Sequence, residues 1–149
     1  MTTFDFSLPG NANKTINLSE YKGKKNIVLY FYPKDNTPGC TIEANDFNNK
    51  ISDFAANDTI VIGVSADSVA SHDKFIAKYE LNFDLISDSD KELCNKLGVW
   101  VEKSMYGKKY MGIERSTFVL NKDQEIVKEW RKVKVKNHVE EVLEAVKNI

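Results

Sequence analysis

The stretch NIVLYFYPKDNTPGCTIEAND, residues 26–46, joins two different hydrophobic patterns. Residues 26–32 are an unbroken apolar and aromatic run, which is typical of a β-strand covered on both faces. The next apolar positions are spaced by three or four residues and predict a helix over 41–54, with an inner face of Ala44, Phe47, Ile51 and Phe54. The turn Thr-Pro-Gly therefore connects a strand to a helix, and Cys40 directly follows this turn.

The same alternation of strand and helix continues along the chain. The spacing of apolar residues predicts further strands at 59–66 and 83–88 and further helices at 69–80 and 89–97, the last ended by Gly98. Residues 116–130 predict two strands around a turn at Asn121-Lys122-Asp123. In the closing segment, 137–149, Asn137 is expected to cap a helix, with Glu140 completing a capping box.

These elements define the expected architecture. Strands joined through helices must lie parallel, whereas the strands of 116–130 must be antiparallel, so we expect an α/β protein with a central mixed β-sheet flanked by helices. The order of elements is that of a thioredoxin-like fold. Alternation of apolar and polar residues at 3–8, and weaker alternation at 15–21, predict an N-terminal β-hairpin. Chemistry in such sheets collects beyond the carboxyl ends of the parallel strands, which is where Cys40 falls.

Composition narrows the class of protein. The 149 residues, 42% of them hydrophobic and 29% charged, suit one soluble domain spanning 1–149. The net charge of −1 offers no field for nucleic acid or an anionic membrane, and no apolar run approaches a membrane span. Two distant cysteines form neither a disulfide framework nor a metal site, so we expect no metal and a reducing cytoplasm.

Cys40 is the candidate nucleophile. A thiol acts as a nucleophile when it is ionised, and the free N–H groups and macrodipole of a helix N-terminus stabilise the anion. Pro38 favours the entry into the helix, and Thr37 lies where its hydroxyl can approach the sulfur or its substrate. We therefore expect an anionic, exposed sulfur at the sheet edge. The alternative is that Cys40 is a small, inert residue that fills the core.

The residues around Cys40 resemble a known family. Pro33, Thr37 and Cys40 form the P-x-x-x-T-x-x-C signature of peroxiredoxins, and the string FYPKDNTPGCTIEA resembles the peroxiredoxin Q, or bacterioferritin comigratory protein, subgroup. A second segment, GVWVEKSMYGKKYMGIERSTFVLN at 98–121, is similar to the subgroup's segment leading to its active-site arginine, here Arg115. The resemblance covers essentially the whole chain. It implies a thiol peroxidase that reduces hydrogen peroxide and organic hydroperoxides through a cysteine sulfenic acid, without metal or organic cofactor.

The resemblance also implies roles for individual residues. Thr37, the backbone N–H of Cys40 and Arg115 would bind the peroxide oxygens, and Arg115 would help to keep the sulfur charged. The alternative for Arg115 is an ion pair with Glu114 or Glu129. Glu43 matches an acid or amide position of the subgroup and either orients Arg115 or is a solvated carboxylate in the first turn of the helix.

Regeneration of the thiol is where this chain departs from the pattern. Many members of the subgroup carry a resolving cysteine five positions after the first, but that position here is Asn45. Two interpretations stay open for Cys94: it resolves the sulfenic acid after the helix at 41–54 frays, or it fills a core site and an external thiol reduces Cys40. By resemblance, the electron source is thioredoxin, glutaredoxin or glutathione, and the protein is a monomer.

Four further features are interpreted mainly as structural. His72 is expected on the surface of its helix, and His138 in the first turn of the closing helix. The aromatic and Met-rich segment before Arg115, from Trp100 to Met111, is expected to be a loop packed over the core, with part of it near the peroxide pocket. The alternating run RKVKVK at 131–136 is expected to be a solvent-facing edge that resists strand pairing.

Overall fold

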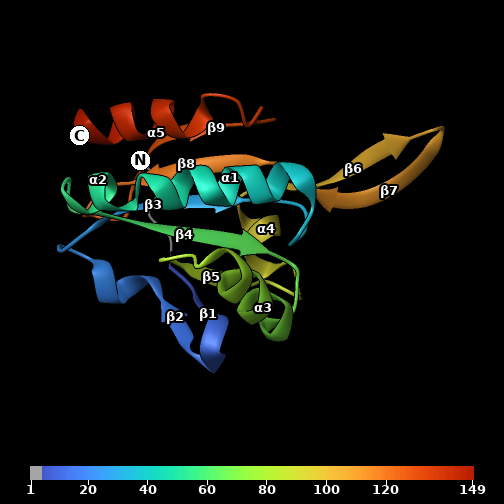
Figure 1. The fold of residues 1–149 in the computed structure, drawn as a ribbon, viewed down its shortest axis with the longest axis horizontal. Helices are drawn as coiled ribbons and strands as arrows, with labels where there is room; N and C mark the ends of the chain where they lie inside the picture. The colour runs from blue at the N-terminus through green and yellow to red at the C-terminus, as the bar shows by residue number, and fades with distance from the viewer. Residues whose placement is uncertain (1–4) are drawn as a thin grey trace.

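A five-stranded mixed sheet forms the centre of the computed structural model, which describes residues 5–149. The strand order is β5-β4-β3-β8-β9; β3, β4 and β5 are parallel, and β8 and β9 are antiparallel to their neighbours (Figure 1). The bounds of these strands are β3 Asn26–Phe31, β4 Thr59–Ser65, β5 Asp84–Ser87, β8 Ser116–Leu120 and β9 Ile126–Trp130. The expected α/β architecture with a central mixed sheet is confirmed.

Strand β3 is central because both of its faces are apolar. Its alternate residues enter two hydrophobic clusters, Val28 and Tyr30 on one face and Ile27, Leu29 and Phe31 on the other. All six residues of β3 are buried, as expected for a strand with helices or hairpins on both sides. Burying each large apolar side chain contributes about 2 kcal/mol, so this strand anchors the layers above and below it.

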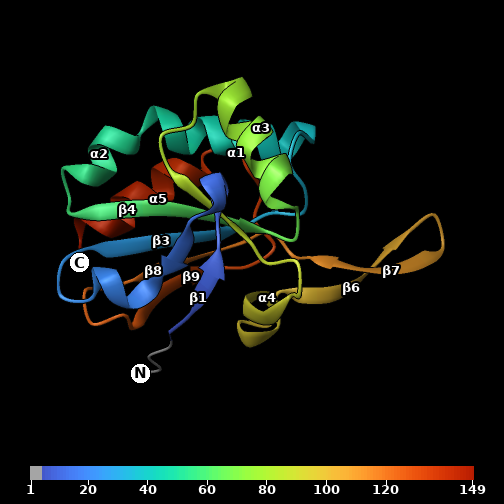
Figure 2. The ribbon, with the colours of Figure 1, turned by 90° about the horizontal axis from the view of Figure 1, so that it is seen from below.

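The helices and the N-terminal hairpin cover the two faces (Figures 1 and 2). Residues of α1, α2, α3 and α5 enter the cluster with Tyr30, and residues of the N-terminal hairpin and α4 enter the cluster with Leu29. The bounds are α1 Pro38–Asn49, α2 Ile51–Ala55, α3 Val69–Tyr79, α4 Glu92–Lys96, α5 His138–Lys147, β1 Ser7–Pro9 and β2 Thr15–Asn17. The hairpin β1–β2 is antiparallel as predicted, although residues 3 and 4 of its expected first strand lie outside the described residues.

The helix predicted over 41–54 starts earlier and is divided. Pro38 is its first residue, after the extended Thr37, because the fixed φ of proline suits that position and its missing N–H costs nothing there. Lys50, with φ −109° and ψ 8°, separates α1 from α2. Cys40 is therefore the third residue of α1 and lies within the helix, not in the turn before it.

The segment expected to be a loop over the core is a second hairpin. Strands β6, Trp100–Met105, and β7, Lys108–Ile113, pair antiparallel around Tyr106 and Gly107, both of which have positive φ as a tight two-residue turn requires. The ribbon stands away from the sheet in both views (Figures 1 and 2). Met105, Tyr106, Tyr110 and Met111 are exposed, 98% for Tyr106, so the expectation of packing over the core is wrong for these residues. Trp100, at the base of the hairpin, does pack against the core cluster that contains Leu29.

Two helix-end signals gave different outcomes. Gly98 has φ 72° and its N–H donates to Asn95, which confirms that it ends α4, although α4 spans only 92–96. The capping box at α5 is wrong, because Asn137 is in the left-handed conformation and its side chain makes no cap hydrogen bond. Residues 131–136 are not a strand, since β9 ends at Trp130. Within residues 5–149, no helix is long and apolar enough to cross a membrane.

Candidate active site

Cys40 lies beyond the carboxyl end of β3, in the first turn of α1. The side chain of Thr37, the N-cap residue, makes no hydrogen bond to the first turn, so within residues 5–149 the first amides are not occupied by a side-chain oxygen. The expectation of an exposed sulfur is wrong. Cys40 is only 1% accessible and belongs to the same apolar cluster as Ala44 and Phe47. The polar partner of the sulfur is Arg115, whose Nη2 donates to Sγ over 3.3 Å.

Arg115 is held between Cys40 and Glu43. Its Nη1 donates to Oε1 of Glu43 over 2.6 Å, so one guanidinium bridges the sulfur and a carboxylate. Burial would lower the pKa of Arg115, but the negative charges of Glu43 and Cys40 outweigh burial and raise it. The alternative pairing with Glu114 does not occur, because Glu114 accepts from Arg131 over 2.7 Å.

Glu43 is a buried acid, not a solvated first-turn carboxylate. It is 0% exposed, and burial raises its pKa to about 7 although Arg115 opposes the rise. Its Oε2 and the hydroxyl of Tyr30 are both buried without a hydrogen-bond partner. Within the helix, the three-residue spacing from Cys40 puts both side chains on the face that receives the guanidinium.

Gly39 and Thr37 precede Cys40 at the start of α1. A Cβ at position 39 would lie 3.2 Å from Nη2 of Arg115, so the missing side chain makes room for the guanidinium. The hydroxyl of Thr37 donates to the carbonyl oxygen of Lys34 over 2.8 Å, inside the loop that joins β3 to α1. Pro33 begins this loop and is exposed.

Comparison with known proteins identifies the family. Residues 2–129 match the AhpC/TSA family. Peroxiredoxin Bcp of Bacillus subtilis is 52% identical over 145 residues, which cover 97% of this chain and 92% of the relative. The structure of Xanthomonas campestris peroxiredoxin Q superposes with a TM-score of 0.91 at 45% identity, over 96% of this chain and 90% of that one. A second structure with the same figures is of the X. campestris bacterioferritin comigratory protein, described with alkyl peroxide reduction activity.

The chain belongs to the peroxiredoxins.

The second thiol of this peroxiredoxin lies on the other side of the sheet. Cys94 is 0% exposed and packs in the cluster with Leu29 and Leu93, whereas Cys40 packs in the cluster with Tyr30. Burial, and then the adjacent carboxylate of Asp88, raise the pKa of Cys94 well above its usual range. The structure therefore does not bring the candidate resolving cysteine to the first thiol.

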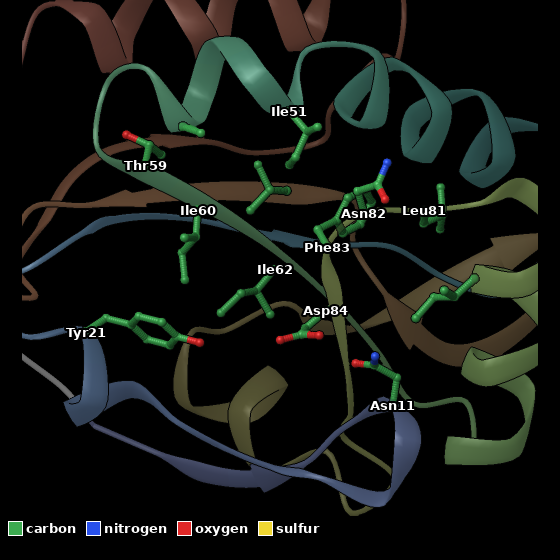
Figure 3. A pocket seen from close by; sticks show the side chains of 13 residues that line it. Asn11, Tyr21, Ile51, Thr59, Ile60, Ile62, Leu81, Asn82, Phe83 and Asp84 are labelled. Atoms are coloured by element: carbon green, nitrogen blue, oxygen red, sulfur yellow. The ribbon is translucent and has the colours of Figure 1, made fainter.

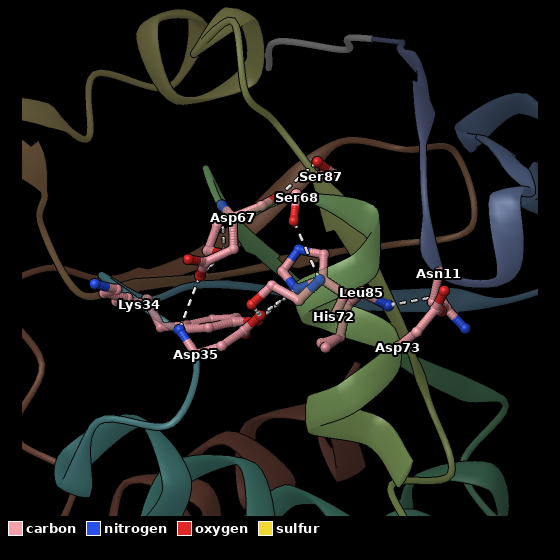
Figure 4. Close-up of polar contacts among 12 residues, drawn as sticks. Asn11, Lys34, Asp35, Asp67, Ser68, His72, Asp73, Leu85 and Ser87 are labelled. Atoms are coloured by element: carbon pink, nitrogen blue, oxygen red, sulfur yellow. Dashed lines mark hydrogen bonds and ion pairs between the residues drawn. The ribbon is translucent and has the colours of Figure 1, made fainter. Parts of the chain in front are cut away.

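The peroxiredoxin also contains a polar cluster that the sequence patterns did not reveal (Figure 4). His72, expected on the surface, is 0% exposed and lies 2.8 Å from Asp35, so that expectation is wrong. A signal was available, because Asp35, Asp67 and Asp88 each follow a parallel strand and such residues meet at one sheet edge. A lone histidine in an amphipathic helix gave no indication that it faces this edge.

A pocket of about 400 Å³ lies apart from these groups, around the amino-terminal half of β4 (Figure 3). Its lining combines apolar side chains such as Ile60 and Ile62 with Tyr21, Asn11 and Asp84. Cys40, Arg115 and Glu43 are not among its lining residues. The pocket is therefore separate from the thiol site.

Proposed function

We propose that this peroxiredoxin reduces hydrogen peroxide and alkyl hydroperoxides through a sulfenic acid at Cys40. The observation that carries the proposal is the guanidinium of Arg115, 3.3 Å from Sγ, at an uncapped helix N-terminus. A cation and the positive end of a helix both favour an anionic sulfur. The alkyl peroxide reduction described for the X. campestris relative supports the same substrate class.

The proposed reaction assigns a task to each group. The thiolate of Cys40 attacks the terminal oxygen of the peroxide, an S–O bond forms as the O–O bond breaks, and the leaving oxygen takes a proton from water to become water or alcohol. Sulfur loses two electrons and the peroxide gains them. Arg115 and the free amides donate to the oxygen that gains charge. Because the hydroxyl hydrogen of Thr37 is directed at Lys34, its oxygen is left to accept from the peroxide O–H.

We further propose that an external thiol completes the cycle. Cys94 is walled off by the sheet and its thiol is held protonated, so it is a poor resolving group. An external thiol attacks the sulfenic sulfur, water leaves, and a second thiol reduces the mixed disulfide. Thioredoxin, glutaredoxin and glutathione all supply this chemistry in a reducing cytoplasm, where we expect the protein to act as a monomer.

Mass spectrometry after one equivalent of peroxide tests both steps. We expect one added oxygen on Cys40, trapped by a sulfenic-acid reagent, with Cys94 still a free thiol. The Cys94→Ser variant should turn over like the parent protein with an external thiol, whereas Cys40→Ser should lose all turnover. A Cys40–Cys94 crosslink would instead establish an internal two-cysteine cycle.

Two rival functions predict other results. A thiol–disulfide oxidoreductase normally needs a second cysteine three residues away, where this chain has Glu43, and it would form no fast sulfenic acid. A chaperone or interaction domain would keep its function in Cys40→Ser.

A further inference from the structure

The polar cluster behind the loop 33–37 is defined here as the Asp35 cluster: Tyr32, Asp35, Asp67, Ser71 and His72. Asp35 is 5% exposed and His72 is 0% exposed. Oδ1 of Asp35 accepts from the Tyr32 hydroxyl over 2.6 Å, and Oδ2 accepts from the Ser71 hydroxyl over 2.8 Å. The backbone N–H of Asp35 donates to Asp67 over 2.8 Å (Figure 4). These bonds tie the loop to Tyr32, which directly follows β3, to the segment after β4 and to α3.

Both ring nitrogens of His72 make hydrogen bonds. Its Nε2 is 2.9 Å from the carbonyl oxygen of Ile86, which only accepts, so Nε2 carries a proton. Its Nδ1 is 2.8 Å from Oδ2 of Asp35, and that bond also needs a proton. The two contacts of the ring therefore join α3 to the loop on one side and to β5 on the other.

The same atoms are not free for another ligand. Those of Asp35, Asp67 and His72 lie within 4.8 Å of one another, as metal ligands would. Both ring nitrogens of His72 already face oxygen atoms, and both Asp35 oxygens already accept from hydroxyl groups. The groups satisfy one another, which indicates a role in holding the loop.

The loop transmits this restraint to Thr37. Asp35 directly follows Lys34, whose carbonyl oxygen accepts the Thr37 hydroxyl over 2.8 Å. Asn36 between them has φ 63°, a left-handed conformation that fixes the turn. A displacement of Asp35 must therefore move the carbonyl that directs the hydroxyl of Thr37. Arg115 contacts the sulfur of Cys40 and forms its own ion pair with Glu43.

We infer that Asp35 and His72 are positioning residues that set the direction of the Thr37 hydroxyl through the carbonyl of Lys34. The inference rests on the proposed peroxidase function. Its consequence is that the Asp35 cluster affects the attack on peroxide and leaves the ionisation of Cys40 to Arg115.

A double-mutant cycle tests the inference. The variants are His72→Ala, Thr37→Val and both together, and the measurement is the second-order rate constant for peroxide with pre-reduced protein. We expect about a 100-fold loss for Thr37→Val and about a 10-fold loss for His72→Ala, since small misplacements of a positioning group cost rate in this range. In the double variant the loss should not exceed that of Thr37→Val alone, because the hydroxyl that His72 directs is already absent.

Two readouts separate positioning from a general loss of structure. The thiolate absorbance of His72→Ala should follow the parent protein across pH. The matched control is Gln124→Ala, which removes another buried polar side chain and its bond to the carbonyl of Leu18, at the far end of β3. It should lower the melting temperature without changing the rate constant. If His72→Ala does not fold, Asp35→Asn, which keeps the shape of the side chain, replaces it in the same cycle.

Each outcome decides a separate question. Additive losses in the cycle, or a thiolate titration that shifts with the rate, overturn the inference. A parent protein that forms no sulfenic acid at Cys40 overturns the proposed function itself, before any variant is compared.

Discussion

The two cysteines occupy the same position in two helices and have opposite surroundings. Cys40 is the third residue of α1 and Cys94 the third residue of α4, and both side chains are buried. At α4 the carboxylate of Asp88 accepts from the amides of Leu93 and Cys94, so the helix end is already neutralised by an anion. At α1 no side chain caps the amides, and a guanidinium contacts the sulfur. A position at a helix N-terminus does not by itself make a thiol reactive. The charge of the groups next to the helix amides and the sulfur has the larger effect.

The largest effect should come from removing the cation at Cys40. Arg115→Leu leaves the sulfur with a buried carboxyl group as neighbour, as at Cys94. We expect a loss of about 100- to 1,000-fold in the rate constant with peroxide, since a donor to the developing charge is lost. We also expect about 3 kcal/mol lower stability, because Glu43 loses its partner. Stopped-flow mixing and urea unfolding measure the two effects.

Arg115→Leu combined with Glu43→Gln is the control. The double variant should recover the stability lost in Arg115→Leu but not the rate constant with peroxide. Recovery of both would mean that Arg115 acts only as a structural partner of Glu43.

The next effect concerns pH and the buried acid beside Cys40. The pKa of Glu43 is about 7 in the folded protein against an ordinary 4.5, so between these values the folded state keeps a proton that the unfolded state has lost. Glu43 therefore lowers stability as pH rises through this window, by about 3 kcal/mol in full. Burial and Arg115 lower the pKa of His138 from 6.5 to about 4, so His138 raises stability as pH rises between those values.

These two contributions oppose each other between pH 4.5 and 6.5. We expect Glu43→Gln to gain stability more steeply with pH than the parent protein, because the rise from His138 is unmasked. Urea unfolding at several pH values gives the slopes. If the free energy of unfolding changed with pH in the same way in both proteins, the raised pKa of Glu43 would be contradicted.

The smallest effect should come from making Cys94 more like Cys40. Asp88→Asn removes the negative charge and keeps a residue able to cap α4, so we expect a stability loss of about 1 kcal/mol. The pKa of Cys94 should fall, but the thiol should still resist alkylation in the native protein, since burial is the larger cause of its raised pKa. Rapid alkylation would show that Asp88 alone keeps it inert. Asp123→Asn, in an exposed turn, is the matched control.

Local sequence patterns predicted the features that depend only on residues close together in the sequence. The apolar run of β3 and the Thr-Pro-Gly turn sufficed for the sheet and for the position of Cys40. The approach of Arg115, 75 residues away from Cys40, came only from resemblance to a family. His72 was misplaced because its partner Asp35 is 37 residues away and no periodicity links them. The β6–β7 hairpin is not predictable from its composition, because exposed apolar residues such as Met105 and Tyr106 mimic a buried segment.

The close approach of Arg115 to Gly39 limits how this site can be altered. A methyl group at position 39 would meet the guanidinium at 3.2 Å, so the arginine would have to give way by a few tenths of an ångström. Its bond to the sulfur and its bond to Glu43 would both be disturbed by that shift. Anyone who transplants this helix start into another scaffold must therefore move the glycine and the arginine as one unit.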